Sequence, residues 1–173
     1  NHLVALGHTR IGFTSGPERY VPVRRKLEGY HHAMKEHGLD GEELVELSLF
    51  GVEGGDAAAG RLLDRGVTAM VCGSDMMALG AIRAARRRGL KIPQDFSVVG
   101  YDDSQLVAFT DPPLTTVRQP INDMALAAVR ALCDEIAGHE VSRTEFMFAP
   151  ELVVRGSTTA VPRASTVVAE RIV

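Results

Sequence analysis

Apolar residues recur at two different spacings along the chain, and this pattern predicts strands that alternate with helices. Residues 10–14 (RIGFT) form a short run of strand-forming residues, and after it apolar Val23, Leu27, Tyr30 and Met34 lie at the spacing of one helical face. The same order of spacings then repeats. It predicts further strands at residues 44–49, 68–72 and 97–101 and further helices at residues 56–65 and 76–88.

Three glycines mark the ends of these helices. Gly38, Gly66 and Gly89 each follow a predicted helix, where the left-handed conformation of a C-cap costs glycine least. Parallel strands joined by helices require crossover connections, and these connections cover both faces of the sheet. We therefore expect an α/β fold with a doubly wound, mainly parallel sheet.

The last third of the chain carries a different pattern. After the Pro112–Pro113 turn, apolar residues trace one face of a helix over residues 121–136, and residues 146–154 offer strand-forming material. The end of the chain is expected to be flexible. The predicted organisation is one domain over residues 1–156 and a flexible tail over residues 157–173.

The composition is that of a soluble globular protein. Of the 173 residues, 45% are hydrophobic and 24% are charged, and no apolar run approaches the roughly 20 residues that span a bilayer. A formal net charge of -3 argues against DNA contact through this chain, since DNA-binding modules carry a clustered basic surface. We expect no association with a membrane.

Motifs for cofactors, metals and common catalytic centres are missing from the sequence. Cys72 and Cys133 lie far apart and in no metal-binding spacing, so we interpret both as small buried apolar residues in a reducing, cytoplasmic compartment. The patterns GxGxxG, GxxxxGK[ST] and GxSxG do not occur. We therefore expect no cofactor, no metal and no catalytic residue.

Polar and aromatic residues follow the predicted strands, at the edge where open α/β sheets bind their ligands. These residues are Ser15, Phe50, Ser74, Asp75, Asp102 and Asp103. A carboxylate can accept two hydroxyl hydrogen bonds while an aromatic ring covers an apolar face, so the set is typical of a sugar or nucleoside pocket. The alternative is structural, because aspartate and serine are favoured as helix caps and in turns.

Several segments occur together and in an order that resembles the lac-repressor-type (LacI/GalR) family of transcriptional regulators. The most specific are SDMMALGAIRAARRRGLKIPQDFSVVGYDD at residues 74–103 and PPLTTVRQP at residues 112–120. The resemblance implies a two-lobed sensor of the periplasmic-binding-protein fold (type I), joined to an amino-terminal helix-turn-helix headpiece. This chain is similar to the carboxyl-terminal lobe with its crossover segments, and residues 1–7 are typical of a helix that began upstream. We therefore expect a fragment that lacks the headpiece and most of the amino-terminal lobe.

The resemblance also assigns residues to an effector site between the lobes. It implies that Asp102 and Ser74 hydrogen-bond the effector and that Phe50 covers one of its faces. The family usually has an arginine at the position of Lys26, with Arg25 beside it in this chain. Lysine supplies a point charge without the bidentate fork of arginine, so the effector chemistry at Lys26 differs from that of the family.

The function that the resemblance implies is regulation of transcription by a small effector. A sugar-like or nucleoside-like molecule shifts the lobe arrangement, and a homodimeric repressor in the cytoplasm then changes its affinity for operator DNA. One alternative is a solute-binding protein for sugar uptake, which shares the fold. The other is an α/β enzyme or phosphoacceptor module that uses Asp102 and Asp103, with magnesium as a suitable ion.

Overall fold

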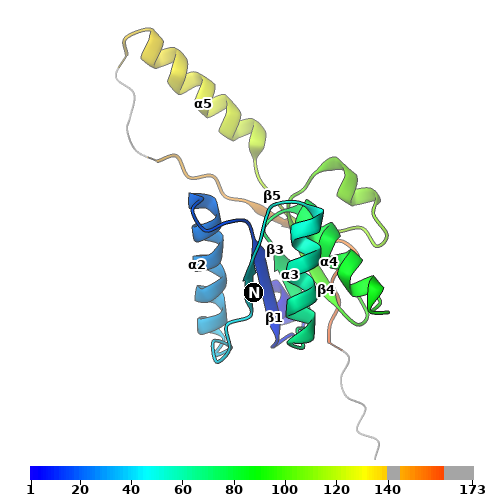
Figure 1. Ribbon diagram of the computed structural model, residues 1–173. Coiled ribbons are helices and arrows are strands. Elements are labelled where there is room, and N and C mark those ends of the chain that lie inside the picture. The colour runs from blue at the N-terminus through cyan, green and yellow to red at the C-terminus, as the bar shows by residue number, and fades with distance from the viewer. Residues whose placement is uncertain (140–144, 162–173) are drawn as a thin grey trace, which may run out of the picture.

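A six-stranded sheet forms the centre of the structure (Figure 1). The computed structural model describes residues 1–139 and 145–161. In chain order, the strands are β1 (Ile11–Ser15), β2 (Val45–Leu47), β3 (Ala69–Cys72), β4 (Ser97–Asp102), β5 (Thr115–Arg118) and β6 (Glu151–Val153). They lie in the order β2-β1-β3-β4-β5-β6, and every neighbouring pair is parallel except β5 and β6. The predicted mainly parallel sheet is confirmed.

Helices lie on both faces of this sheet, as a doubly wound fold requires. The helices are α1 (His2–Ala5), α2 (Val21–Glu36), α3 (Val52–Asp64), α4 (Asp75–Arg87) and α5 (Ile121–Ile136), with a short 3-10 helix η1 (Gln105–Phe109) after β4. Figure 1 shows α2 on one face and α3 with α4 on the other. Each face therefore has its own apolar core, one beneath α1 and α2 and a larger one beneath α3 and α4.

Small residues bring α3 and α4 into close contact. A Cβ atom on Gly55 would lie 2.1 Å from the Met77 carbonyl oxygen, and one on Gly80 would lie 2.1 Å from the Val52 carbonyl oxygen. The backbones therefore meet where glycine leaves room, and Met77 and Leu62 are fully buried beside them. This close approach fixes the loop from β3 into α4, which forms part of the candidate site.

Four elements differ from the sequence-based expectation by more than one residue. The strand expected over residues 44–49 is limited to Val45–Leu47, and the helix expected from residue 56 begins at Val52. Residues 115–118 form β5, a strand that the apolar spacing did not predict. Its sequence, TTVR, has no alternation of apolar and polar residues and lies between Pro113 and Pro120, so the local signal for a strand is weak. The strand expected over residues 146–154 is limited to Glu151–Val153.

The domain extends beyond the predicted boundary at residue 156. Ser157 is fully buried, and its Oγ donates to the Val98 carbonyl at 2.6 Å and accepts from the Thr115 amide at 2.8 Å. Farther along, the Val161 amide donates to the Leu6 carbonyl at 3.0 Å. The expectation of a flexible tail is therefore wrong for residues 157–161, which are paired with distant segments. The rest of the predicted tail, residues 162–173, lies outside the described residues.

A buried histidine fastens this segment to the amino ends of the strands. His8 is 4% exposed. Its Nδ1 lies 2.9 Å from the Thr68 Oγ1, and its Nε2 lies 3.2 Å from the Ser97 Oγ and 3.0 Å from the Thr159 carbonyl oxygen. Because a carbonyl oxygen only accepts, Nε2 carries the proton. We call His8, Thr68, Ser97 and Thr159 the amino-edge network.

Helix α5 has the residue bounds that the sequence predicts, but none of its residues is buried. It extends away from the sheet (Figure 1), and its apolar Leu132 and Ile136 are exposed. Cys133 on this helix is exposed too, so the expectation that both cysteines are buried holds only for Cys72. Neither α5 nor any other helix within residues 1–139 and 145–161 has the length and apolarity that crossing a membrane requires.

Candidate functional site

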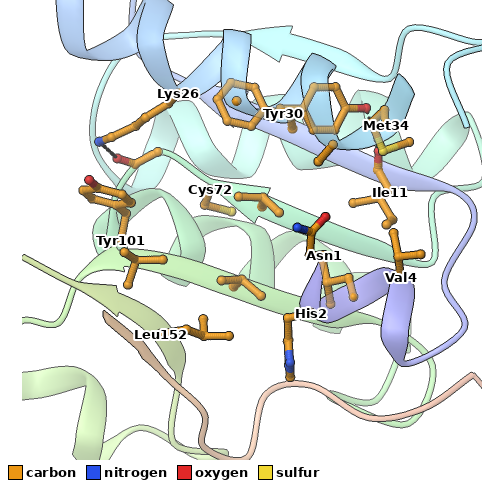
Figure 2. Close-up of a pocket in the computed structure, with 18 residues that line it drawn as sticks. Asn1, His2, Val4, Ile11, Lys26, Tyr30, Met34, Cys72, Tyr101 and Leu152 are labelled. Carbon is orange, nitrogen blue, oxygen red and sulfur yellow. Dashed lines mark hydrogen bonds between the residues drawn. The ribbon is translucent and has the colours of Figure 1, made fainter. Parts of the chain in front are cut away.

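The carboxyl ends of the parallel strands meet along one edge of the sheet, as predicted for a ligand site. The edge is formed by Ser15 at the end of β1, by Gly73 and Ser74 after β3, and by Asp102 at the end of β4. A cavity of about 360 Å³ runs from this edge along the sheet beneath α2 (Figure 2). Most of its lining is apolar, so the polar chemistry of the site is concentrated at the strand ends.

Lys26 reaches this edge from α2. Its Nζ donates to the Gly73 carbonyl oxygen at 3.0 Å and lies 3.5 Å from the centre of the Tyr101 ring (Figure 2). Burial lowers the pKa of Lys26, and the negative charge of Asp102 acts in the opposite direction. The ammonium is thus fixed between β3 and β4, where it presents positive charge beside Asp102.

Asp102 is half-buried at the end of β4. Its Oδ1 accepts a hydrogen bond of 2.8 Å from the Gln119 Nε2. Burial raises the pKa of Asp102 above its ordinary value, although Lys26 and the Gln119 hydrogen bond favour the ionised form. Sequence reasoning missed Gln119, whose only signal is its position directly after β5 at the same edge.

Asp103 has a different environment from its neighbour. Its Oδ1 accepts from the Arg155 Nη2 and its Oδ2 from the Arg118 Nε, both at 2.6 Å. Burial raises the pKa of Asp103, but the hydrogen bonds of the two arginines outweigh it and hold the pKa below its ordinary value. Both oxygens of Asp103 are therefore engaged by arginine, which disfavours a magnesium ion shared by Asp102 and Asp103.

Ser74 and Asp75 separate into two structural roles. Ser74 caps α4, since its Oγ accepts from the Met77 amide at 3.2 Å. This is the capping alternative considered for serine at this position. Asp75 is 2% exposed and accepts from the Ser104 amide at 2.7 Å and from the Thr116 Oγ1 at 2.6 Å. Ser74 stays half-exposed at the edge, whereas Asp75 connects α4 to the turn after β4.

Phe50 and Arg25 differ in how available their side chains are to a ligand. Phe50 is 51% exposed, with its ring centre 5.9 Å from that of Tyr20. Arg25 forms a bidentate ion pair with Glu145, at 2.5 and 3.0 Å. Arg25 also lines a second hollow of about 230 Å³ together with Tyr101 and Gln119. Phe50 therefore offers an aromatic face to a ligand, whereas the guanidinium of Arg25 is already paired.

Ser15 is an exception to the usual pairing of buried polar groups. It is fully buried, and its Oγ has no hydrogen-bond partner among the residues that the structure describes. A Cβ atom on Gly73 would lie 2.1 Å from this Oγ, so glycine at that position makes room for the hydroxyl. The carboxyl edge thus contains a buried hydroxyl, that of Ser15, without a hydrogen-bond partner among the described residues.

Comparisons with known proteins agree with this architecture. The family model of the periplasmic binding protein-like domain matches residues 1–158. The HTH-type transcriptional regulator MalR of Streptomyces coelicolor is 60% identical over 166 residues, which are 93% of this chain and 48% of MalR. The chain spans about half the length of the curated relatives that it matches.

Solved structures of regulators superpose on most of the chain. The complex of the transcriptional regulator CelR with cellobiose has a TM-score of 0.86 at 37% identity, covering 90% of this chain and 49% of CelR. The lac repressor dimer bound to operator and the anti-inducer ONPF has a TM-score of 0.83 at 34% identity, covering 92% of this chain and 56% of the repressor chain. The chain therefore belongs to the periplasmic binding protein-like domain family, in the lac-repressor-type group of transcriptional regulators.

Proposed function

We propose that this chain is the effector-sensing lobe of an operator-binding regulator whose effector is a sugar or a molecule with similar hydroxyl groups. The observation that carries the proposal is the position of Asp102. Its carboxylate lies at the ligand edge of the sheet, where Gln119 is its one hydrogen-bond donor among the described residues. Lys26 adds positive charge beside it. A carboxylate in this state can accept further hydrogen bonds from hydroxyl groups.

The remaining features of the edge suit a polyhydroxylated ring. The exposed face of Phe50 can cover the apolar face of a sugar, and the Ser74 hydroxyl lies at the same edge. The structural neighbour CelR was solved with cellobiose, which supports a sugar as the effector class. Because Lys26 donates from a point charge instead of a planar fork, we expect a hydroxyl or ring oxygen opposite it, not a carboxylate.

The mechanism that we propose is a shift in population between lobe arrangements. An effector that binds one arrangement more tightly favours it, and a DNA-binding headpiece then gains or loses operator affinity. The similar lac repressor, solved as a dimer bound to operator, supports a homodimer that binds operator DNA. Such a repressor acts on chromosomal DNA, which places it in the cytoplasm, and it needs no catalytic residue.

Two rival functions lead to different expectations. A solute-binding protein would bind the same sugar but would not respond by releasing operator DNA. An enzyme or phosphoacceptor would use Asp102 and Asp103 together, which the arginines on Asp103 disfavour. Among the residues described, no group of three or more histidine, cysteine, aspartate and glutamate side chains is arranged to hold a metal ion.

The test is a thermal-shift screen of the full-length gene product with cellobiose, its α-linked isomer maltose, ribose, uridine and Mg²⁺. A molecule at a hundred times its Kd stabilises the native state by about 2.7 kcal/mol. We expect one of the sugars or the nucleoside to raise the Tm. Asp102→Asn should lose most of this shift, whereas Asp40→Asn, in an exposed loop, should keep it. A shift with Mg²⁺ alone that Asp102→Asn abolishes would contradict the proposal.

A further inference from the structure

The turn after β4 has an unusual backbone. Among the described residues, positive φ angles occur at six glycines and at two other residues, Asp102 with φ 115° and Asp103 with φ 53°. Glycine adopts this region at little cost, whereas a residue with a Cβ atom is strained there. The chain thus uses glycine wherever such a turn is needed, except at the two aspartates of the candidate site.

Three side chains hold this turn without contacting Asp102 itself. Arg155 binds Asp103 at 2.6 Å and also donates to the Leu114 carbonyl at 2.8 Å, so it ties the turn to the start of β5. Arg118 binds the other oxygen of Asp103. The buried Asp75 accepts from the Ser104 amide, directly after the two aspartates. A Cβ atom on Gly100 would lie 2.4 Å from the Asp75 Oδ1, so glycine there makes room for the carboxylate.

We propose that Asp75, Asp103 and Arg155 are positioning residues, which hold the strained turn at Asp102 so that its carboxylate faces the effector. Strained backbone persists where surrounding contacts over-determine it, and it is concentrated at functional sites. Here the contacts act on the two residues that follow Asp102, namely Asp103 and Ser104, while Asp102 itself is bonded to Gln119 at the site. This proposal rests on the proposed function for the identity of the ligand, but the strain itself does not.

The first test compares the Tm of two aspartate-to-glycine variants of the full-length protein. At Asp102, glycine removes the strain, whereas at Asp40, in an exposed loop without a positive φ, it adds only entropy to the unfolded chain. We expect Asp102→Gly to raise the Tm by roughly 2–6 °C and Asp40→Gly to leave it equal or lower. A Tm for Asp102→Gly at or below that of the wild type would show that the backbone at Asp102 is not strained.

The second test measures what the hydrogen bonds of Arg155 to Asp103 and the Leu114 carbonyl do for the turn. In Arg155→Gln, the Ser104 amide should exchange its hydrogen at least about tenfold faster, because the turn relaxes away from Asp75. Affinity for whichever molecule of the screen binds the wild type should fall about tenfold, although Arg155 bonds Asp103 and not Asp102. His8→Ala, which destabilises the opposite edge, should leave both values unchanged.

The outcomes separate the two proposals. If the Ser104 amide exchanges its hydrogen in Arg155→Gln at the same rate as in the wild type, the positioning role is overturned. Faster exchange with unchanged sugar affinity would overturn it as well, since the turn would then not determine how Asp102 binds. If none of cellobiose, maltose, ribose and uridine binds the wild type, the proposed effector class fails, while the Tm comparison and the exchange of the Ser104 amide still test the strained turn and the positioning role of Arg155.

Discussion

The two edges of the parallel sheet carry similar polar residues in different states. At the amino edge, the imidazole of His8 is bonded on both nitrogens, and Ser97 and Thr159 are bonded to it and to each other. At the carboxyl edge, Ser15 is buried without a partner among the described residues, and Asp102 is held at a positive φ. The polar groups at the amino edge therefore have hydrogen-bond partners, whereas at the carboxyl edge the Ser15 hydroxyl has none among the described residues.

The difference indicates which edge stabilises the fold and which is available for binding. A buried polar group contributes to stability when it is bonded and costs free energy when it is not. The amino-edge network joins the start of β4 to a segment near the end of the described chain. The carboxyl edge retains strain and unused hydrogen-bonding capacity, which are the properties expected where a ligand completes the structure.

Removal of His8 should have the largest effect on stability. His8→Ala leaves the Thr159 carbonyl and the Thr68 and Ser97 hydroxyls without their shared partner. We expect the free energy of unfolding to fall by about 3 kcal/mol, measured by denaturation in urea. His32→Ala, at an exposed position on α2, is the matched control and should change it by less than about 0.5 kcal/mol. A loss below about 1 kcal/mol for His8→Ala would mean that the amino edge does not stabilise the fold.

Two buried serines allow the same substitution to be compared at the two edges. Ser97→Ala removes a bonded hydroxyl from the amino-edge network and should cost about 1–2 kcal/mol of unfolding free energy. Ser15→Ala removes a hydroxyl that has no partner among the described residues and should stabilise the protein by about 1 kcal/mol. Changes of the same sign in urea denaturation would show that the two edges do not differ as described.

Lowering the pH should reduce the contribution of His8 to the free energy of unfolding, and this effect should be smaller than that of removing its side chain. Burial lowers the pKa of His8, the Thr159 carbonyl opposes this shift, and the charge of His2 adds to it. The folded state therefore favours neutral His8, so its contribution is fully present above the unfolded pKa of about 6.5 and is lost as the pH falls below it. The slope from this group is at most about 1.4 kcal/mol per pH unit. We expect His8→Gln to remove this part of the slope between pH 7 and 5, and an unchanged slope would contradict the assignment.

The parts of the fold with a local signal could be predicted from the sequence. The apolar spacing that predicts α4 reflects its buried face, and the same spacing gives the correct bounds of α5. Spacing does not report whether a partner is present, so the apolar pattern alone does not indicate that no residue of α5 is buried. The strand β5 pairs with β4, and residues 157–161 bond to Val98 and Leu6. No local sequence pattern contains these long-range pairings.

The same limit applies to the candidate site. Asp102 and Ser74 could be placed at the ligand edge because Asp102 ends β4 and Ser74 comes two residues after the end of β3. The role of Asp103 could not, since Arg118 and Arg155 approach it from positions 15 and 52 residues away. The Lys26 contact with the Gly73 carbonyl likewise spans 47 residues. The assignment of these residues to an effector remains a prediction.

Hydrogen exchange with and without a sugar tests most directly whether the carboxyl edge is the effector site. The full-length protein would be measured by mass spectrometry with the sugar that raises its Tm in the screen, and Asp102→Asn would be measured in parallel. We predict slower exchange over residues 73–75 and 101–104, no change over residues 8–10 and 157–160, and loss of the effect in Asp102→Asn. Protection confined to residues 8–10 and 157–160, or protection that Asp102→Asn retains in full, would contradict this account.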